Sequence, residues 1–191
     1  MSGCWAPVGD PLLSDYHDEE WGRPVGDESL LFERVSLEGF QSGLSWRTVL
    51  AKRPAFREVF AEFDPVVVAA FTDADVERLM TDARIIRNRR KIEAVIANAR
   101  LLLDAPGELP RLLWSHEPAD KPAPATLAEV PPTSPEAVAL SKLLRRRGFA
   151  FVGPVTVYSS MQACGLIDDH VADCPCRPGV EAERTAFVRP G

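Results

Sequence analysis

Apolar residues recur at intervals of three and four positions along most of the chain, which is the spacing of one face of an α-helix. No segment shows the strict alternation of apolar and polar residues that is typical of a half-buried strand. The clearest helical run follows Asn88 and comprises Ile92, Val95, Ile96, Ala99, Leu102 and Leu103. The pattern therefore predicts an all-α protein.

Capping residues divide this pattern into separate helices. Asp27 is a suitable N-cap for a helix that continues at least to Glu38 and ends near Gly39 or Gly43. An acid close to the end of an apolar helix is seldom buried unless it is paired or used, so Glu38 is either a solvated helix glutamate or a functional acid.

The next helix is expected from about Trp46 to Lys52. Proline lacks the N–H that an interior helical position needs, so Pro54 predicts a break before a restart at residues 56–60.

Two helices with a short break between them form a helix–hairpin–helix candidate. Thr72 and Asp75 resemble a capping box, with Asp in place of the usual Glu or Gln, at the start of the first helix. The break covers residues 82–87, and the second helix follows from Asn88. Such a hairpin presents backbone N–H groups and a helix N-terminus to phosphates.

The second half of the chain contains an irregular region and two more helices. Residues 105–133 carry seven prolines and are expected to form the longest irregular segment, with a turn at residues 112–114. Start and stop residues predict one helix from Ser134 to Gly148 and another from Pro154 to Gly165.

The segment after Cys176 is expected to be poorly ordered. With 191 residues, the chain is long enough for one good-sized core and too short for two ordinary domains. We therefore expect a single all-α domain over residues 1–180 and a disordered tail over residues 181–191.

Composition narrows the class of protein further. No apolar run approaches the roughly 18 residues that a membrane span requires, so no membrane partner is expected. The first residues lack the basic start and apolar stretch of a secretory signal, which predicts a cytoplasmic protein. The formal net charge of −6 disfavours a nucleic-acid partner unless basic groups gather locally, as in residues 87–91 and 142–147. Both runs are also compatible with solvated helix ends.

Four residues at opposite ends of the chain could hold a metal. His170 and Cys174 are four positions apart, and Cys4 with His17 would complete a closed tetrahedral zinc site of the structural kind. Such a site would clasp the two ends together and lower the loop entropy of the unfolded chain. The alternative is that these are unrelated side chains. Cys176 is a competing ligand, and Cys164 fits a buried core thiol.

Several ordered motifs spread over the chain resemble bacterial 3-methyladenine DNA glycosylases of type I. They occupy residues 16–22, 37–46, 149–154, 158–163 and 169–170, and the resemblance spans roughly Cys4 to Cys174. This family belongs to the helix–hairpin–helix DNA glycosylase superfamily. The resemblance implies an all-helical fold and one structural zinc ion that joins the N- and C-terminal segments, with Cys4, His17, His170 and Cys174 as ligands.

The resemblance also implies a reaction, the hydrolysis of the N-glycosidic bond of 3-methyladenine in double-stranded DNA that contains alkylated purines. Methylation at N3 leaves the base positively charged, so it is a good leaving group. Aromatic faces and a carboxylate attract such a cation. The matching base-binding residues are Tyr16, Trp21, Trp46 and Glu38, with Trp5 as a possible fifth member.

Glu38 is the matching catalytic residue. It would bind the base edge, stabilise the cationic sugar or orient water, and the sequence does not separate these roles. No lysine falls in the motif that contains Glu38 and Trp46, so no Schiff-base (lyase) step is expected.

An enzyme that acts on a duplex base must extrude it, and a side chain commonly fills the space that the base leaves. Leu44, on the turn at Gly43, is the matching wedge, although it could equally be a core leucine. In the hairpin, Arg87, Arg89 and Lys91 are the expected DNA contacts.

The chain departs from the family at the hairpin. Relatives usually carry glycines where Arg84 and Arg90 stand, and glycine permits positive φ and a close backbone approach. The two arginines would then compensate through side-chain contacts with phosphates. This departure motivates a second hypothesis, a zinc-stabilised protein that binds alkylated DNA without catalysis. A zinc hydrolase is disfavoured because four protein ligands leave no position for water. We expect a monomer.

Overall fold

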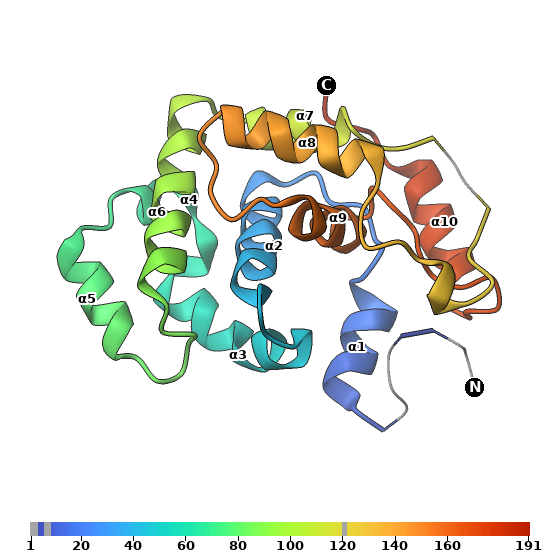
Figure 1. Ribbon diagram of the computed structural model, residues 1–191, viewed down its shortest axis with the longest axis horizontal. Helices are drawn as coiled ribbons and strands as arrows, with labels where there is room; N and C mark the ends of the chain where they lie inside the picture. Colours follow the sequence, from blue (N-terminus) through green and yellow to red (C-terminus); the bar gives the residue numbers. More distant parts are fainter. Residues whose placement is uncertain (1–3, 6–8, 120–121) are drawn as a thin grey trace.

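The computed structural model describes residues 4–5, 9–119 and 122–191, and this part of the chain contains ten α-helices, two short 3-10 helices and no strand (Figure 1). The all-α prediction is therefore confirmed for these residues. The 3-10 helices are Ala61–Phe63 and Leu127–Glu129. The α-helices are α1 (Pro11–Glu19), α2 (Glu28–Gln41), α3 (Trp46–Val59), α4 (Pro65–Ala69), α5 (Asp73–Thr81), α6 (Arg89–Asp104), α7 (Glu108–Trp114), α8 (Pro135–Arg146), α9 (Pro154–Ala163) and α10 (Arg177–Ala186).

Helix α2 lies at the centre of the fold and packs against α3, α6, α7 and α9 (Figure 1). Its apolar residues join a single large core, in which aromatic rings are prominent. Phe40, Phe56 and Phe60 are fully buried there, with the rings of Phe40 and Phe56 4.5 Å apart. The burial of these side chains fixes α2, and with it the orientation of Glu38.

Several predicted helix starts are confirmed. The Asp27 side chain accepts a hydrogen bond from the N–H of Leu30, and Asn88 caps α6 in the same way. Thr72 and Asp75 form both bonds of a capping box at α5. Helices α1 and α4 each begin with an Asp N-cap followed by a Pro, and the caps are Asp10 and Asp64. These two helices were not predicted.

The predicted break at Pro54 is wrong, because α3 runs without interruption from Trp46 to Val59 with Pro54 inside it. A proline in a helix interior costs about 3 kcal/mol. Leu50 and Phe56, on either side of Pro54, are almost completely buried. Burial of each such side chain contributes about 1.5–3 kcal/mol, which is enough to keep the helix continuous.

The region after α6 is more ordered than the prolines predicted, because α7 forms inside residues 105–133. The Glu28 carboxylate accepts hydrogen bonds from the N–H groups of Gly107 and Leu109, and the Trp114 ring N–H donates to the carbonyl oxygen of Val25. These partners come from α2 and the segment before it, so local sequence could not reveal them.

A poorly ordered segment after Cys176 was also predicted, and this is wrong for residues 177–186, which form α10. Val180 is fully buried, and Arg184 donates a hydrogen bond to the carbonyl oxygen of Leu166. Beyond the helix, the Phe187 ring lies 4.6 Å from the ring of Trp114. Contacts with distant segments therefore order α10.

None of the helices in the described part of the chain is both long enough and apolar enough to cross a bilayer.

Candidate functional site

A cavity of about 340 Å³ lies where α1, α2, α3 and α9 meet. All four side chains that were predicted to bind a base line it, namely Tyr16, Trp21, Glu38 and Trp46, and Trp5 lines it as well. We call this the aromatic cavity. The structure therefore brings together residues from four separate parts of the sequence.

The rings of the aromatic cavity support one another at angles. The Tyr16 ring lies 5.2 Å from Trp46 and 6.1 Å from Trp5, and Trp5 meets Trp21 edge to face at 5.5 Å. Tyr16 and Trp21 are buried, whereas Trp46 is only half-buried. Such rings present π-faces that attract cations and stack with flat molecules.

Glu38 is the unusual group of this cavity. The side chain is buried, and its Oε2 atom has no hydrogen-bond partner among the described residues. Burial without a compensating cation raises the pKa of the carboxyl to about 8. An unpaired buried acid costs folding free energy, so its presence here indicates that a ligand satisfies it.

Polar residues of α9 and the segment after it complete the cavity, and no role was predicted for them. Ser159, Gln162 and Asp169 line the wall. Asp169 accepts hydrogen bonds from the Tyr158 hydroxyl (2.6 Å) and from Gln162 Nε2 (2.8 Å). Spacing on α9 and the motif at residues 158–163 could have indicated this wall.

Leu127 and Val130 also line the aromatic cavity. They come from the proline-rich segment, which carries no periodic signal that would place it against the cavity.

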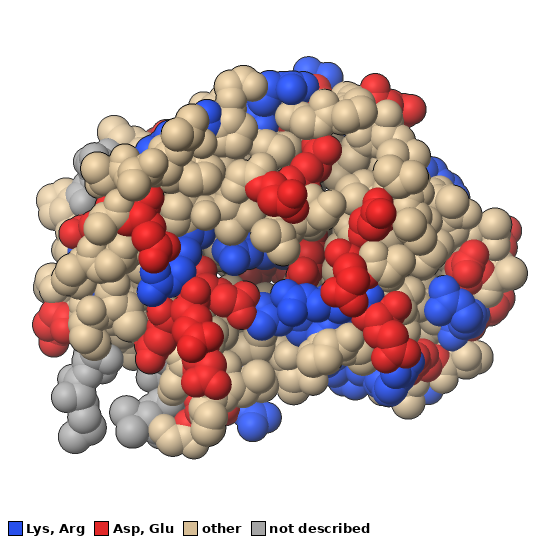
Figure 2. Space-filling view, turned by 180° about the vertical axis from the view of Figure 1, so that it is seen from behind, with Lys and Arg blue, Asp and Glu red and all other residues tan. Residues whose placement is uncertain are grey.

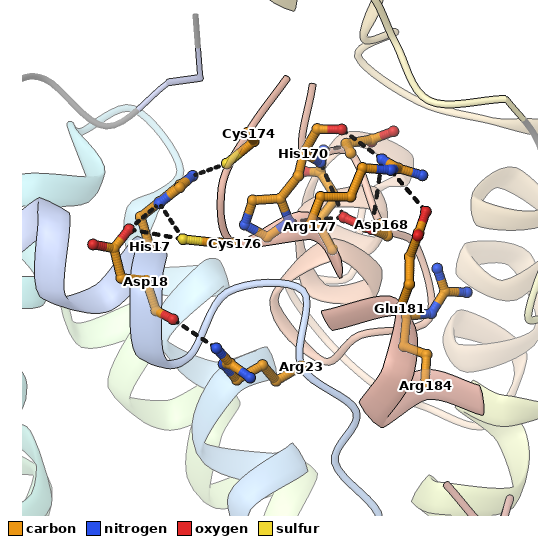
Figure 3. Close-up of polar contacts among 12 residues, drawn as sticks. His17, Asp18, Arg23, Asp168, His170, Cys174, Cys176, Arg177, Glu181 and Arg184 are labelled. Carbon is orange, nitrogen blue, oxygen red and sulfur yellow. Dashed lines mark hydrogen bonds and ion pairs between the residues drawn. The ribbon is translucent and has the colours of Figure 1, made fainter. Parts of the chain in front are cut away.

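On the far side of Trp21 lies a group of metal-ligating side chains. The ligand atoms of Cys4, His17 and Cys174 all lie within 4.8 Å of one another, and all three residues are buried. The Cys174 sulfur is 3.8 Å from His17 Nε2 (Figure 3). We call these three residues the Cys/His cluster, and they could hold a metal ion.

His170 is outside this group, but it faces it. Its ring centroid lies 4.7 Å from that of His17, and its Nδ1 is bonded to Asp168 at 2.7 Å (Figure 3). Its Nε2 is buried and has no partner among the described residues. A buried imidazole nitrogen without a partner, on a ring in contact with His17, fits the fourth ligand of a tetrahedral site.

The competing cysteine belongs to a second group. Cys176 approaches His17 from the Nδ1 side, and its thiol donates to Asp18 Oδ1 at 3.2 Å. Asp18 is bonded to His17 Nδ1 at 2.6 Å, so this nitrogen is occupied while Nε2 faces Cys174. Cys164 is fully buried in the main core, as predicted, and burial raises the pKa of its thiol to about 12.

The predicted wedge lies on an exposed turn, residues 42–45, between α2 and α3. Gly43 has φ of +83°, which an L side chain rarely adopts, and nothing lies within 4 Å of where its Cβ would be. Leu44 is 43% exposed, which excludes the alternative that it is a core leucine. An apolar side chain on an exposed turn leaves water when it enters an apolar partner. Its insertion therefore costs little free energy.

The side chains of the 82–88 loop and the start of α6 that were predicted to contact DNA differ in their exposure. Arg87 and Arg89 are exposed, and Arg89 also pairs with Glu77 at 2.7 Å. The prediction for Lys91 is wrong, because its side chain is buried and its ammonium group donates to carbonyl oxygens at the end of α2. Lys91 and its neighbour Ile92 lie on the face of α6 that packs against the rest of the protein. Both side chains are therefore buried.

Arg84 and Arg90, which stand where the resemblance implies glycine, are accommodated without backbone strain. Among the described non-glycine residues, those with positive φ are Ala61, Glu62, Phe63 and Phe151, so neither Arg84 nor Arg90 requires glycine's freedom. The Arg84 guanidinium is taken up by Glu58 and Asp82, whereas Arg90 is exposed. In this structure the Arg84 side chain is therefore engaged by two carboxylates, and its contact with phosphate stays a prediction.

Basic and acidic groups are mixed on the face that Figure 2 shows, and they do not form a continuous basic surface there. This arrangement agrees with the net charge of −6. On this chain, exposed local groups such as Arg87 and Arg89 are therefore the candidates for contact with a polyanion.

The fold and the aromatic cavity define an all-helical protein that can enclose a planar, electron-poor ring. A family model described as methyladenine glycosylase matches residues 5–177. The DNA-3-methyladenine glycosylase 1 of Escherichia coli (strain K12) is 51% identical over 185 residues, which cover 94% of this chain and 98% of the relative. The chain belongs to the methyladenine glycosylase family.

Solved structures agree with this. A crystal structure of 3-methyladenine DNA glycosylase I matches with a TM-score of 0.86 and 43% identity over 92% of this chain and 99% of the other. The 3-methyladenine DNA glycosylase I of Staphylococcus aureus, solved to explain recognition of 3-methyladenine, matches with a TM-score of 0.84 and 39% identity. Its alignment covers 90% of this chain and 94% of that chain.

Proposed function

We propose that this protein is a DNA repair glycosylase that extrudes 3-methyladenine from alkylated double-stranded DNA and hydrolyses its N-glycosidic bond. The observation that carries the proposal is Glu38, a buried acid without a partner among the described residues, which lines the aromatic cavity. The relatives named above, which carry the name of this activity, support it.

The chemistry of the substrate suits the site. A purine methylated at N3 is cationic while it is attached to deoxyribose, so the bond to the sugar breaks with little need for an acid. Tyr16 and Trp46 supply aromatic faces for the ring. A cation beside Glu38 favours the carboxylate, so uptake of the base drives the proton from this residue. The ionised carboxylate then attracts the charged base more strongly than it attracts neutral adenine.

Water is the proposed nucleophile, and no lyase step follows. No lysine lines the aromatic cavity in the described part of the chain. The ammonium groups of Lys52 and Lys91 are bonded to carbonyl oxygens, and Lys142 is exposed on α8. Lys121 lies outside the described residues. Among the described residues, no lysine amine is therefore placed to form a Schiff base in the aromatic cavity.

Leu44 is the proposed wedge, which enters the base stack when the target nucleotide leaves it. The exposed side chains of Arg87 and Arg89, with the N-terminus of α6, are the proposed phosphate contacts. A monomer is the proposed oligomeric state.

Zinc is the proposed metal, with Cys4, His17, His170 and Cys174 as its four ligands. The buried Nε2 of His170 and the close approach of the other three ligand atoms support this assignment. When bound, the ion would supply a closed structural link between the segment before α2 and the segment after α9. The four residues would hold the ion and fix the two segments relative to each other. None of them is needed to move a proton in the reaction.

One assay tests the reaction. DNA treated with a methylating agent is incubated with the wild type, with Glu38→Gln and with Glu19→Gln, which changes an exposed glutamate of α1. The wild type and Glu19→Gln should release 3-methyladenine at equal rates, and Glu38→Gln should be slower by roughly tenfold or more. Binding of methylated DNA by folded wild type without release would instead support a binding protein that lacks catalysis.

A further inference from the structure

Two lysines connect the exposed turn (residues 42–45) with the 82–88 loop. Lys91, in the first turn of α6, donates hydrogen bonds from Nζ to the carbonyl oxygens of Phe40 (2.9 Å) and Ser42 (2.7 Å). These carbonyls lie at the C-terminal end of α2, where no further helical N–H is available to them. The helix that follows the 82–88 loop therefore holds the start of the exposed turn.

The second lysine makes the opposite connection. Lys52, on α3, donates from Nζ to the carbonyl oxygens of Ala83 (3.1 Å) and Arg84 (2.9 Å). Helix α3 begins immediately after the exposed turn. Each of the two segments is thus gripped by a lysine from the helix that follows the other segment. We call this pair of contacts the lysine brace.

Arg84 strengthens the brace in this chain. Its guanidinium pairs with both carboxylate oxygens of Glu58, on α3, at 2.7 and 3.0 Å. Its backbone N–H donates to Asp82 within the loop at 2.8 Å. The glycine expected at this position has no side chain and could not make the contact with Glu58.

The contacts of Lys91 are strong enough to fix geometry. The ammonium is buried and faces the negative end of the α2 dipole, where a cation is favoured. Hydrogen bonds from a charged donor are about twice as strong as neutral ones. Loss of the ammonium would also leave carbonyl oxygens unsatisfied in a buried place.

We propose that Lys52 and Lys91 are positioning residues that set the place of Leu44 relative to the 82–88 loop, so that phosphate contact and wedge insertion occur together. This inference rests on the proposed function, because it assigns the exposed turn and the loop to DNA. An error of about 1 Å in such a placement is enough to lower a rate strongly.

Helix α2 also carries Glu38, so the brace must be distinguished from a general role in shaping the aromatic cavity. The two roles predict different results. A residue that positions Leu44 affects the DNA duplex but leaves binding of the free base unchanged. A residue that shapes the cavity weakens binding of the free base as well.

The test uses the full chain and a duplex with 2-aminopurine beside a tetrahydrofuran abasic analogue, which reports disturbance of the stack without any excision. We expect Lys91→Met and Lys52→Met each to lower the fluorescence response roughly tenfold at saturating protein. Affinity for free 3-methyladenine should stay at the wild-type value. Lys142→Met, which removes an exposed lysine on α8, is the matched control and should respond as the wild type does.

The decisive comparison repeats the fluorescence assay with the lysine variants in a chain that also carries Leu44→Ala. If the brace acts through the wedge, the lysine changes should cause no further loss in a chain that lacks Leu44. An equal loss with and without Leu44 would overturn the inference, as would parallel loss of free-base affinity or an unchanged fluorescence response. Lys91→Arg, which keeps the positive charge, should recover part of the response.

Folding is checked by thermal melting of each variant. Should Lys91→Met fail to fold, Lys52→Met carries the test, because Lys52 is only half-buried. Failure of the proposed function is separately visible. Wild type that disturbs the stack but releases no base contradicts the glycosylase assignment and leaves the comparison of variants intact.

Discussion

The rings of His17 and His170 meet edge to face where the N- and C-terminal segments come together, with centroids 4.7 Å apart. Each ring is bonded through Nδ1 to an aspartate, His17 to Asp18 at 2.6 Å and His170 to Asp168 at 2.7 Å. A carboxylate on Nδ1 fixes the tautomer that leaves the Nε2 lone pair for a metal. Two separate segments thus each carry a histidine whose Nε2 is left for a metal, and the two rings are in contact.

This relationship predicts the metal content. Protein purified without added metal should contain about one zinc ion per chain by elemental analysis. His170→Ala should lose the ion and lower the melting temperature, because the link between the two segments contributes to folding free energy. Stable, active protein that contains no metal would contradict the proposed site.

The pKa of Glu38 predicts a pH-dependent cost in stability. The folded pKa is about 8, above the ordinary value of 4.5, so the folded state holds a proton that the unfolded state has already lost. The free energy of unfolding should therefore fall as the pH rises from about 4.5 to 8. Glu38→Gln removes this dependence and should stabilise the protein at pH 8 by on the order of 4 kcal/mol more than at pH 4.

Denaturant unfolding at several pH values measures this effect. Glu19→Gln, at an exposed position, should leave the slope of stability against pH unchanged. Equal stabilisation by Glu38→Gln at both ends of the pH range would show that the carboxyl is not protonated in the folded protein.

The position of Trp46 indicates that its ring contributes to the affinity of the aromatic cavity for the free base. Its ring lies 5.2 Å from Tyr16 at the half-exposed side of the aromatic cavity. Stacking of a base on an aromatic side chain contributes about 1–3 kcal/mol, so Trp46→Ala should weaken binding of free 3-methyladenine by roughly 5- to 150-fold in calorimetry. Trp46→Phe should retain most of the affinity, and an unchanged affinity in Trp46→Ala would remove this residue from the site.

The backbone around Gly165, at the end of α9, leaves no space for a side chain at this position. Gly165 has φ of +78°, and a Cβ at this position would lie 2.4 Å from the backbone carbon of Arg23. Gly165→Ala should therefore lower the free energy of unfolding by about 2–4 kcal/mol. Gly179→Ala, in α10 with nothing within 4 Å, should instead raise it by about 0.5–1 kcal/mol, because alanine favours a helix more than glycine does. Similar stabilities of the two variants would be incompatible with this packing.

The sequence by itself determined most helix starts and the aromatic and acidic members of the site that were predicted to bind a base. Caps such as Asp27 and Asn88 act within three residues, so local sequence is enough to find them. The motifs that contain Tyr16, Glu38 and Trp46 likewise named residues that the fold brings to one cavity.

Only the tertiary structure decided what surrounds these groups. Glu38 has a raised pKa because other elements bury it, and Lys91 faces the end of α2 rather than solvent because α6 packs inward. Helix α10 forms because Val180 and Arg184 meet partners far along the chain. Burial and long-range partners depend on how helices pack, and packing is a property of the whole chain that no local pattern contains.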